Sequence, residues 1–281
     1  MKKRSIFNTV ISWLLLGVLI IIYLFPLFWL ILTTLKSRPQ IFNIPPLFTF
    51  KPIFTNFRDI FYVSRTGGDT HFAFYFQMSI LISVLSTLCA VTFGTMAAYS
   101  LSRFKVSGKN DLMFLILSTR MLPAVATLVP LYLMYIQLGL RDTIFGMVLL
   151  YTMFNLGFTV WMMKSFIDEI PKEYEEAALV DGYTRFEAFM KIVLPQAATG
   201  IATSAVFSLI FTWNEFTYSS ILTDRYARTV PPAASIYMGF EGFEWGRIAA
   251  TALLFVVPVL IFTFIVRKSL LRGLTFGAIK R

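Results

Sequence analysis

The stretch Glu176-Ala177-Ala178-Leu179-Val180-Asp181-Gly182, followed after nine residues by Ile192-Val193-Leu194-Pro195, decides how the fold is read. The stretch is charged, amphipathic and rich in helix-forming residues, yet it lies between two long apolar runs. A membrane protein that keeps such a segment between its spanning helices presents it to something outside the bilayer. The contrast therefore predicts a membrane protein with a functional loop on one side of the membrane.

The composition agrees with a polytopic membrane protein. Of 281 residues, 57% are hydrophobic and only 14% are charged, and the mean hydropathy is +0.71. Soluble domains carry about 25% charged residues. Apolar runs long enough to cross a hydrocarbon core of about 30 Å lie at 10–35, 74–101, 112–135, 144–167, 197–222 and 248–271. We therefore expect an all-α protein with six transmembrane helices, the third of which is interrupted by Arg120, Pro123 and Pro130.

The distribution of basic residues predicts the orientation. Six spans place both termini on one side, and that side carries fifteen of the 25 lysine and arginine residues. Because cytoplasmic loops carry the excess of Lys and Arg, both termini are expected in the cytoplasm. The formal charge of +10 then reflects topology and attraction to anionic membrane lipid. No basic cluster interleaved with aromatic residues indicates nucleic-acid binding.

Catalytic and metal chemistry finds little support. An intramembrane enzyme would need a Ser/His dyad, paired aspartates or a metal-binding cluster within the spans, but the only histidine, His71, lies in an expected external loop. The only cysteine, Cys89, has no partner for a disulfide. The fragment Gly108-Lys109-Asn110 lacks the upstream glycine and the Ser/Thr of a Walker A sequence. A stand-alone channel would leave the acidic loop unexplained.

The loop can be interpreted residue by residue. Pro171 suits the first turn of a helix, and the glutamates that follow it lie near the positive end of that helix. Gly182 stands where a helix end needs a left-handed residue. Thr184-Arg-Phe-Glu187 has the spacing of a capping box, which begins a second helix, and Pro195 marks the end of that helix or its passage into the fifth span. We expect a short helix, a glycine turn and a second helix along the membrane surface.

This pattern resembles the EAA loop of ABC-importer permeases, which has Glu-Ala-Ala, three residues, Gly, nine residues and Ile-x-Leu-Pro. Each fixed position is present, at Glu176, Ala177, Ala178, Gly182, Ile192, Leu194 and Pro195. The likeness extends from about residue 74 to the C-terminus and is closest to the maltose-type, carbohydrate-uptake branch. That branch is indicated by residues 120–123 with 130–132, by 213–215 and by the tail from 273. Arg281 and Phe276 depart from the tail pattern of the branch.

The resemblance implies a type I ABC-importer permease fold and a set of partners. These are a second permease in a heterodimer, two ATPase subunits that bind ATP and Mg²⁺, an external solute-binding protein and a carbohydrate substrate. The chain itself would be non-catalytic and would hold no cofactor or metal. Its place would be the cytoplasmic (inner) membrane of a bacterium or archaeon. A permease for a polyol phosphate, an amino acid or a peptide is the alternative, because it would share the loop.

The resemblance also assigns sites. The ATPase-coupling residues would be Glu173, Glu176, Ala177, Ala178, Asp181 and Gly182, within a loop at 168–196. A cytoplasmic tail, 273–281, would lie at the ATPase interface through Gly273, Thr275, Gly277 and Lys280. Phe240, Phe243 and Trp245 are the candidate contacts to the binding protein. The expected organisation is a first helix with its external loop at 1–73, a permease core at 74–272 and this tail.

Polar residues within the spans indicate either a solute pathway or a structural role, in which Arg120 would satisfy carbonyls freed by Pro123 and Glu215 would lie in the headgroup zone. Arg120 lies nine residues from Asp111, about 13.5 Å along a helix and so near mid-membrane, where a charge is costly and usually functional or firmly paired. Asn155 is expected at similar depth and in the same cavity. Glu215 is expected roughly 12 Å above Arg120, too far for a direct salt bridge. With Trp213 and Asn214 it is a candidate for an outer gate.

Overall fold

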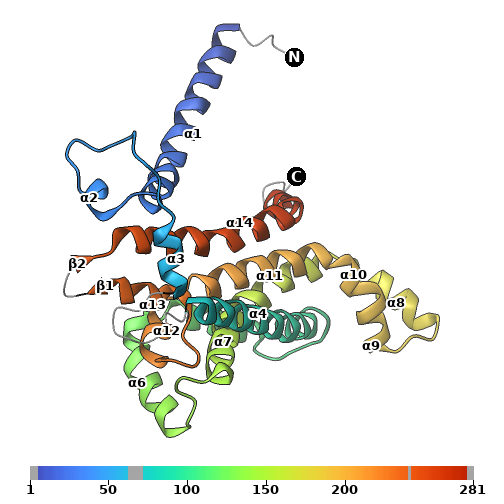
Figure 1. Ribbon diagram of the computed structural model, residues 1–281. Coiled ribbons are helices and arrows are strands. Elements are labelled where there is room, and N and C mark those ends of the chain that lie inside the picture. The colour runs from blue at the N-terminus through green and yellow to red at the C-terminus, as the bar shows by residue number, and fades with distance from the viewer. Residues whose placement is uncertain (1–5, 63–71, 240–241, 277–281) are drawn as a thin grey trace. The chain divides into compact units, whose positions relative to one another are not determined.

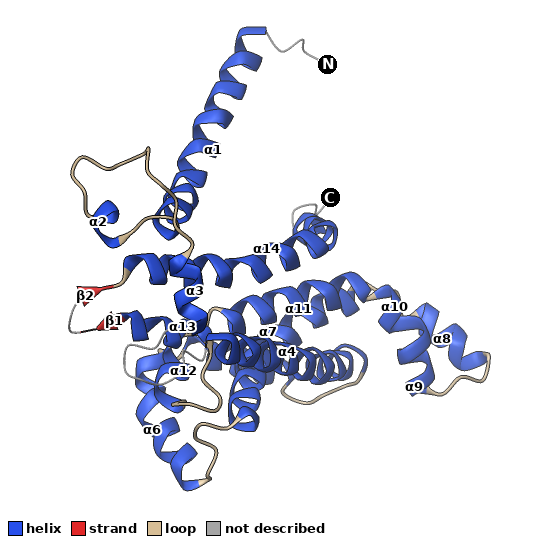
Figure 2. Ribbon diagram, in the orientation of Figure 1, coloured by secondary structure: helices blue, strands red, loops and turns tan. Residues whose placement is uncertain are grey.

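The computed structural model describes residues 6–62, 72–239 and 242–276, and these are almost entirely helical (Figures 1 and 2). The chain divides into two compact units. The first unit comprises Met1–Phe72 and Ala234–Val257, and the second comprises Ala73–Ala233 and Pro258–Arg281. The expected all-α class is confirmed.

The first unit is built from short elements around two helix segments. Its elements are α1 (Ile6–Thr34), α2 (Arg38–Ile41), α3 (Thr55–Tyr62), η3 (Ala234–Tyr237), β1 (Met238–Gly239), β2 (Gly242–Phe243) and the beginning of α14 (Trp245–Phe276). The strands β1 and β2 pair antiparallel, with Met238 opposite Phe243.

One asparagine ties the first unit together. The side-chain amide of Asn56, in α3, donates to the backbone oxygens of Thr34 at 2.8 Å and Lys36 at 2.9 Å. It thereby satisfies carbonyls at the end of α1 that have no intrahelical partner. Gly246, in the first turn of α14, packs so closely that a Cβ there would lie 2.4 Å from the side-chain oxygen of Asn56. The contact requires glycine.

The second unit holds the remaining helices. They are α4 (Phe72–Arg103), α5 (Lys109–Ser118), η1 (Thr119–Met121), α6 (Ala124–Gln137), α7 (Ile144–Asp168), α8 (Glu173–Val180), α9 (Arg185–Ala188), η2 (Phe189–Val193), α10 (Leu194–Gln196), α11 (Ala198–Trp213), α12 (Thr217–Leu222) and α13 (Val230–Ala233). Helix α14 continues into this unit from Pro258.

Two of the six expected spans are not straight helices. In the described residues, α1, α4, α7 and α14 supply helices long and apolar enough to cross a membrane. The third expected span bends by 92° between Lys109–Met121 and Ala124–Gln137, because Pro123 cannot donate a helical hydrogen bond and disfavours helical geometry at Leu122. The fifth ends as a helix at Trp213 and resumes at Thr217, so the prediction of one run through residue 222 is wrong.

Small residues let the helices of the second unit approach closely. A Cβ at Gly157 in α7 would lie 2.8 Å from the backbone oxygen of Ile116 in α5. A Cβ at Gly94 in α4 would lie 2.6 Å from Cγ2 of Thr159 in α7. Small residues at helix crossings are the usual means of tight packing in membranes. Helix α7 therefore packs closely against both α4 and α5 at glycine contacts.

Asp142 joins the loop before α7 to the loop after α12. It adopts a left-handed backbone, with φ of 54°, and its carboxylate accepts backbone N–H groups of residues 224–227 at 3.0–3.1 Å. Its own N–H donates to the oxygen of Leu222 at 2.9 Å. Partial burial raises the pKa of Asp142, but the backbone N–H groups outweigh it, and the pKa is lowered.

Asp142→Asn should destabilise the protein by about 1–2 kcal/mol, because the charged acceptor of several N–H groups is lost. A carboxyl whose folded pKa is depressed stabilises the fold above its unfolded pKa, which is about 3.9, and loses that contribution as pH falls through the folded pKa. The difference in melting temperature between wild type and variant should thus hold from pH 8 to 5 and shrink below about pH 4. Asp224→Asn, at an exposed ion pair, is the control. A pH-independent difference would contradict the prediction.

Candidate functional site

The 168–196 loop forms the expected short helix, glycine turn and second helix, but Pro171 precedes α8, which begins at Glu173, instead of lying in its first turn. Helix α8 is followed by a turn in which Gly182 has a φ of +88°, a conformation that L side chains rarely adopt. The N–H of Tyr183 donates to the oxygen of Ala178 at 3.0 Å. The capping box of α9 is confirmed, because the Thr184 N–H donates to the Glu187 carboxylate at 2.9 Å and the Glu187 N–H to the Thr184 hydroxyl at 3.2 Å. Pro195 lies in α10, just before a 74° bend.

A π-helical turn follows this capping box. Residues Phe189–Val193 form η2, in which the backbone is wound wider than in the α-helices on either side. Such turns are rare and occur mostly as single insertions within helices, frequently at functional sites. Phe189 and Val193 are both buried in this turn. A π-helical turn holds one residue more than an α-helical turn would, and this changes which side chains of the segment face inward.

A buried ion pair anchors α8 to the end of α4. Nε of Arg103 lies 2.5 Å from Oε1 of Glu175, and these side chains are 6% and 10% exposed. The hydroxyl of Tyr99 donates to Oε2 of Glu175 at 2.8 Å, and Nη2 of Arg103 donates to the backbone oxygen of Ile170 at 2.9 Å. The carboxylate and the guanidinium therefore each have a second partner, which a buried pair needs to offset desolvation.

A hydrophobic cluster lies beside this pair. The rings of Tyr99 and Phe189 are 4.5 Å apart. Phe189 packs with a set of fully or nearly buried residues from α4, α7 and the loop, namely Ala98, Met163, Ile167, Ile170, Val193 and Ala197. The loop is thus seated on the helix bundle by both apolar packing and the buried ion pair.

The opposite side of the loop is open. Of the residues assigned to coupling, Glu173, Glu176, Ala177, Asp181 and Gly182 are exposed. Ala178 is buried instead, at 4% exposure, and belongs to the seat of the loop. The exposed apolar side chains are Tyr174, Val180, Tyr183, Phe186 and Met190. The exposed side of α8 and its turn is therefore acidic and apolar, while the Arg103–Glu175 pair and the hydrophobic cluster fix the loop on the helix bundle.

Sequence reasoning missed the three residues that anchor α8. Glu175, Arg103 and Tyr99 stand outside the motif that named the loop. Glu175 and Ala178 stand three residues apart and so lie on the same face of the helix. This spacing is the sequence signal that the buried face of α8 carries an acid beside a small residue. A basic partner for that acid stands at Arg103, the last residue of α4.

A cavity of ≈ 220 Å³ lies within the second unit, between the bent α5–α6 segment, α7 and the break after α11. It is lined by Arg120, Leu122, Ala124, Tyr151, Phe154, Asn155, Phe211, Thr212, Glu215 and Tyr218. Arg120 and Asn155 thus share one cavity, as their depth predicts. The guanidinium of Arg120 lies 4.1 Å from the ring centre of Phe211 and 5.3 Å from that of Phe158, so its charge is stabilised by aromatic faces.

Glu215 occupies the break between α11 and α12. Its carboxylate accepts the hydroxyl of Tyr151 at 2.7 Å and the N–H groups of Tyr218 and Ser219 at 3.0 and 3.2 Å. It therefore caps the first turn of α12, where donors have no helical partner. Asn155, 2% exposed, donates to the hydroxyl of Thr212 at 2.8 Å. The cavity wall is thus held by polar contacts between α7 and the broken span.

Other predicted residues lie elsewhere. Trp213 is buried against Phe76, with ring centres 5.9 Å apart, and Asn214 donates to the oxygen of Ile210, so the structure does not bring these two into the cavity. In the first unit, the rings of Phe243 and Trp245 lie 5.3 Å apart.

Some of the positions assigned to the tail and to the binding-protein contact lie outside the described residues or within α14. Phe240, Gly277 and Lys280 lie outside the described residues, while Gly273 and Thr275 fall within α14. Within the described ranges, no group of three His, Cys, Asp or Glu residues could hold a metal ion.

Known proteins resemble the chain over most of its length. A family model described as binding-protein-dependent transport system inner membrane component matches residues 90–272. The trehalose transport system permease protein SugB of Mycobacterium tuberculosis is 34% identical over 275 residues, which cover 95% of this chain and 97% of that protein. The trehalose/maltose transport system permease protein MalG of Thermococcus litoralis is 30% identical over 92% of each chain.

A solved structure shows the same fold. It is a chain of a bacterial ABC transporter involved in the import of the acidic polysaccharide alginate. The TM-score is 0.77 at 20% identity, over 95% of this chain and 99% of that one. The expected type I importer fold is thereby confirmed.

Glu175→Gln should lower the free energy of unfolding by about 3 kcal/mol, because it leaves the guanidinium of Arg103 buried without its counter-charge. Thermal unfolding of the purified protein in detergent would measure this as a lower melting temperature. Glu176→Gln, at the next and exposed position, is the matched control and should melt like wild type. Equal melting of the two variants would show that the pair does not anchor the loop.

Proposed function

The chain belongs to the family of binding-protein-dependent transport system inner membrane components, as a permease subunit of an ABC importer, and we propose that its solute is a sugar or oligosaccharide. The observation that carries the solute class is the pair of relatives named for trehalose and maltose transport, which match 95% and 92% of this chain. A polyol phosphate, amino acid or peptide permease would share the same loop, and a panel of solutes separates saccharides from polyol phosphates and amino acids.

The chain is a multi-pass, non-catalytic subunit, and we infer that two partner ATPase subunits bind ATP and Mg²⁺. The docking surface that we propose for one of them is the exposed side of α8 and its turn, through Glu173, Glu176, Ala177, Asp181 and Gly182. The buried pair of Arg103 and Glu175 supports this role. A loop that transmits force to the spanning helices must be firmly attached to them. The tail from Gly273 would add contacts through Thr275, Gly277 and Lys280.

The solute would pass along the cavity lined by Arg120, Asn155 and Glu215. This proposal rests on their convergence: a guanidinium, an amide and a carboxylate stand beside Phe154, Phe211 and Tyr218. Polar groups satisfy sugar hydroxyls, and aromatic faces pack against the apolar faces of the ring. Trp213 and Asn214 would support the wall behind this pathway.

The remaining partners follow from the family. We propose a second permease as heterodimer partner, an external solute-binding protein and an orientation with both termini in the cytoplasm. The side of the membrane rests on the excess of Lys and Arg in the connections. Phe243 and Trp245, which are 47% and 44% exposed, and Phe240 between β1 and β2 would then contact the binding protein.

The function is tested by ATP hydrolysis in the reconstituted complex with its binding protein, across a panel of mono-, di- and oligosaccharides, polyol phosphates and amino acids. Saccharides should stimulate hydrolysis and the other classes should not. Stimulation by an amino acid or phosphate alone would keep the importer and overturn the solute class.

The docking surface is tested in the same complex by Val180→Arg, which adds a charge at a residue 87% exposed. It should weaken ATPase binding by about tenfold or more without changing the melting temperature. Tyr226→Arg, in the α12–α13 loop and 69% exposed, is the matched control. ATPase subunits that co-purify equally with both variants would refute the docking role of α8.

Arg120→Met should raise the solute concentration for half-maximal uptake by about tenfold, the effect of losing one hydrogen bond to a charged group. Uptake of the labelled saccharide into proteoliposomes measures it. Arg225→Met changes an exposed arginine outside the cavity and should transport normally. Intact assembly with unchanged uptake in Arg120→Met would remove this residue from the pathway.

A further inference from the structure

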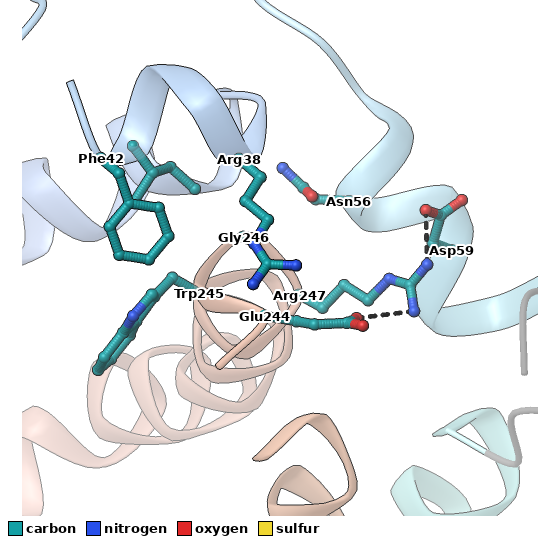
Figure 3. A pocket seen from close by; sticks show the side chains of 9 residues that line it. Arg38, Phe42, Asn56, Asp59, Glu244, Trp245, Gly246 and Arg247 are labelled. Carbon is teal, nitrogen blue, oxygen red and sulfur yellow. Dashed lines mark hydrogen bonds and ion pairs between the residues drawn. The ribbon is translucent and has the colours of Figure 1, made fainter. Parts of the chain in front are cut away.

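A second polar cavity lies entirely within the first unit. It has a volume of ≈ 220 Å³ and is lined by residues of α2, α3 and the start of α14, namely Arg38, Ile41, Phe42, Asn56, Asp59, Glu244, Trp245, Gly246 and Arg247. Figure 3 shows Phe42 and Trp245 together on one side and Asn56, Asp59, Arg247 and Glu244 on the other. The side chain of Arg38 extends between these two sides.

The charges of this cavity balance. Arg247 binds Asp59 at 3.0 Å and Glu244 at 2.8 Å, and the three side chains are only 13–26% exposed. Arg38 supplies a second guanidinium, which lies close to Gly242: a Cβ there would be 3.4 Å from its Nη2. Two cations and two anions leave no net charge, so the cavity favours a neutral ligand over an anion or a cation.

The cavity offers hydrogen-bond donors and acceptors on one side and aromatic rings on the other. Arginine supplies only donors and carboxylates only acceptors. Both amide N–H groups of Asn56 are taken by Thr34 and Lys36, so its side-chain oxygen is what it offers, as an acceptor. Trp245 and Phe42 remain 44% and 57% exposed, so their rings are available to an apolar surface. A sugar ring matches this division, because its hydroxyls both donate and accept while its C–H faces pack on aromatic rings.

The base of the cavity is preorganised. Asn56 is fixed by the carbonyls of Thr34 and Lys36, and Gly246 lies directly against it. Arg247 is fixed by two carboxylates. Groups held in advance lose little freedom on binding, which favours a small polar ligand.

We propose that this cavity binds one sugar ring of a neutral saccharide. Its volume is below the roughly 300–1,000 Å³ of pockets for drug-sized ligands, so a single ring fits and an oligosaccharide would extend from it. The inference rests on the proposed function in its solute class. It adds a saccharide site within the first unit, at residues other than those that line the cavity around Arg120.

The test measures saccharide binding to the complete importer in lipid nanodiscs, without ATP or binding protein, by saturation-transfer NMR. The probes are trehalose, maltose and the anionic sugar glucuronate. Arg38→Gln and Trp245→Ala should each weaken binding of the neutral sugars by about tenfold, and glucuronate should bind less well than either. Arg58→Gln, beside Asp59 but outside the cavity, should bind like wild type.

Three results would overturn the site. If both variants bind the neutral sugars as wild type does, the sugars bind elsewhere in the complex and the site is refuted. Loss of binding-protein affinity in Arg38→Gln, with saccharide binding intact, would make the cavity a protein-docking site. No binding of either neutral sugar, in a complex whose ATP hydrolysis saccharides stimulate, would refute the site and leave the proposed function standing. Hydrolysis that no saccharide stimulates would instead refute the proposed function.

Discussion

The buried pair of Arg103 and Glu175 is the constraint on which the functional surface depends. It joins the last residue of α4 to the first turn of α8, across 72 residues of sequence. A desolvated ion pair adds little net stability compared with apolar packing, but breaking one partner is costly. What the pair supplies is position: α8 can occupy only the place where Arg103, Tyr99 and the oxygen of Ile170 satisfy it together. Movement of the loop must then move α4 with it.

The bent spans obey a related constraint. Within a bilayer, every backbone polar group needs a partner from the protein, so a break in a spanning helix must bring its own donors and acceptors. Glu215 does this at the α11–α12 break, where it accepts two N–H groups and the hydroxyl of Tyr151. At the bend before Pro123, Arg120 lies over the ring of Phe211. Glu215, which satisfies the break in the fifth span, thus also lines the cavity, together with Arg120 from the bend in the third.

How far the sequence predicts this molecule depends on the range of each interaction. The Gly182 turn and the Thr184–Glu187 capping box are predictable because each is complete within six residues of sequence. The sequence does not predict that Glu175 rather than Glu176 is the buried acid, because Arg103, on another helix, determines which of the two is buried. Pro123 announces the bend in the third span. The break in the fifth contains neither proline nor glycine, and only the charge of Glu215 within an apolar run signals it.

The π-helical turn at Phe189–Val193 gives the length of the loop a meaning of its own. One residue advances an α-helix by about 100°, so the extra residue of this turn sets how the capping box and Gly182 are rotated relative to α11. A deletion within Phe189–Val193 that restored regular winding would turn the acidic surface away by that angle while preserving every motif residue. Side-chain replacements on this segment can be absorbed locally, whereas insertions and deletions cannot. The length of the segment between Gly182 and α11 therefore sets the direction in which the acidic surface faces.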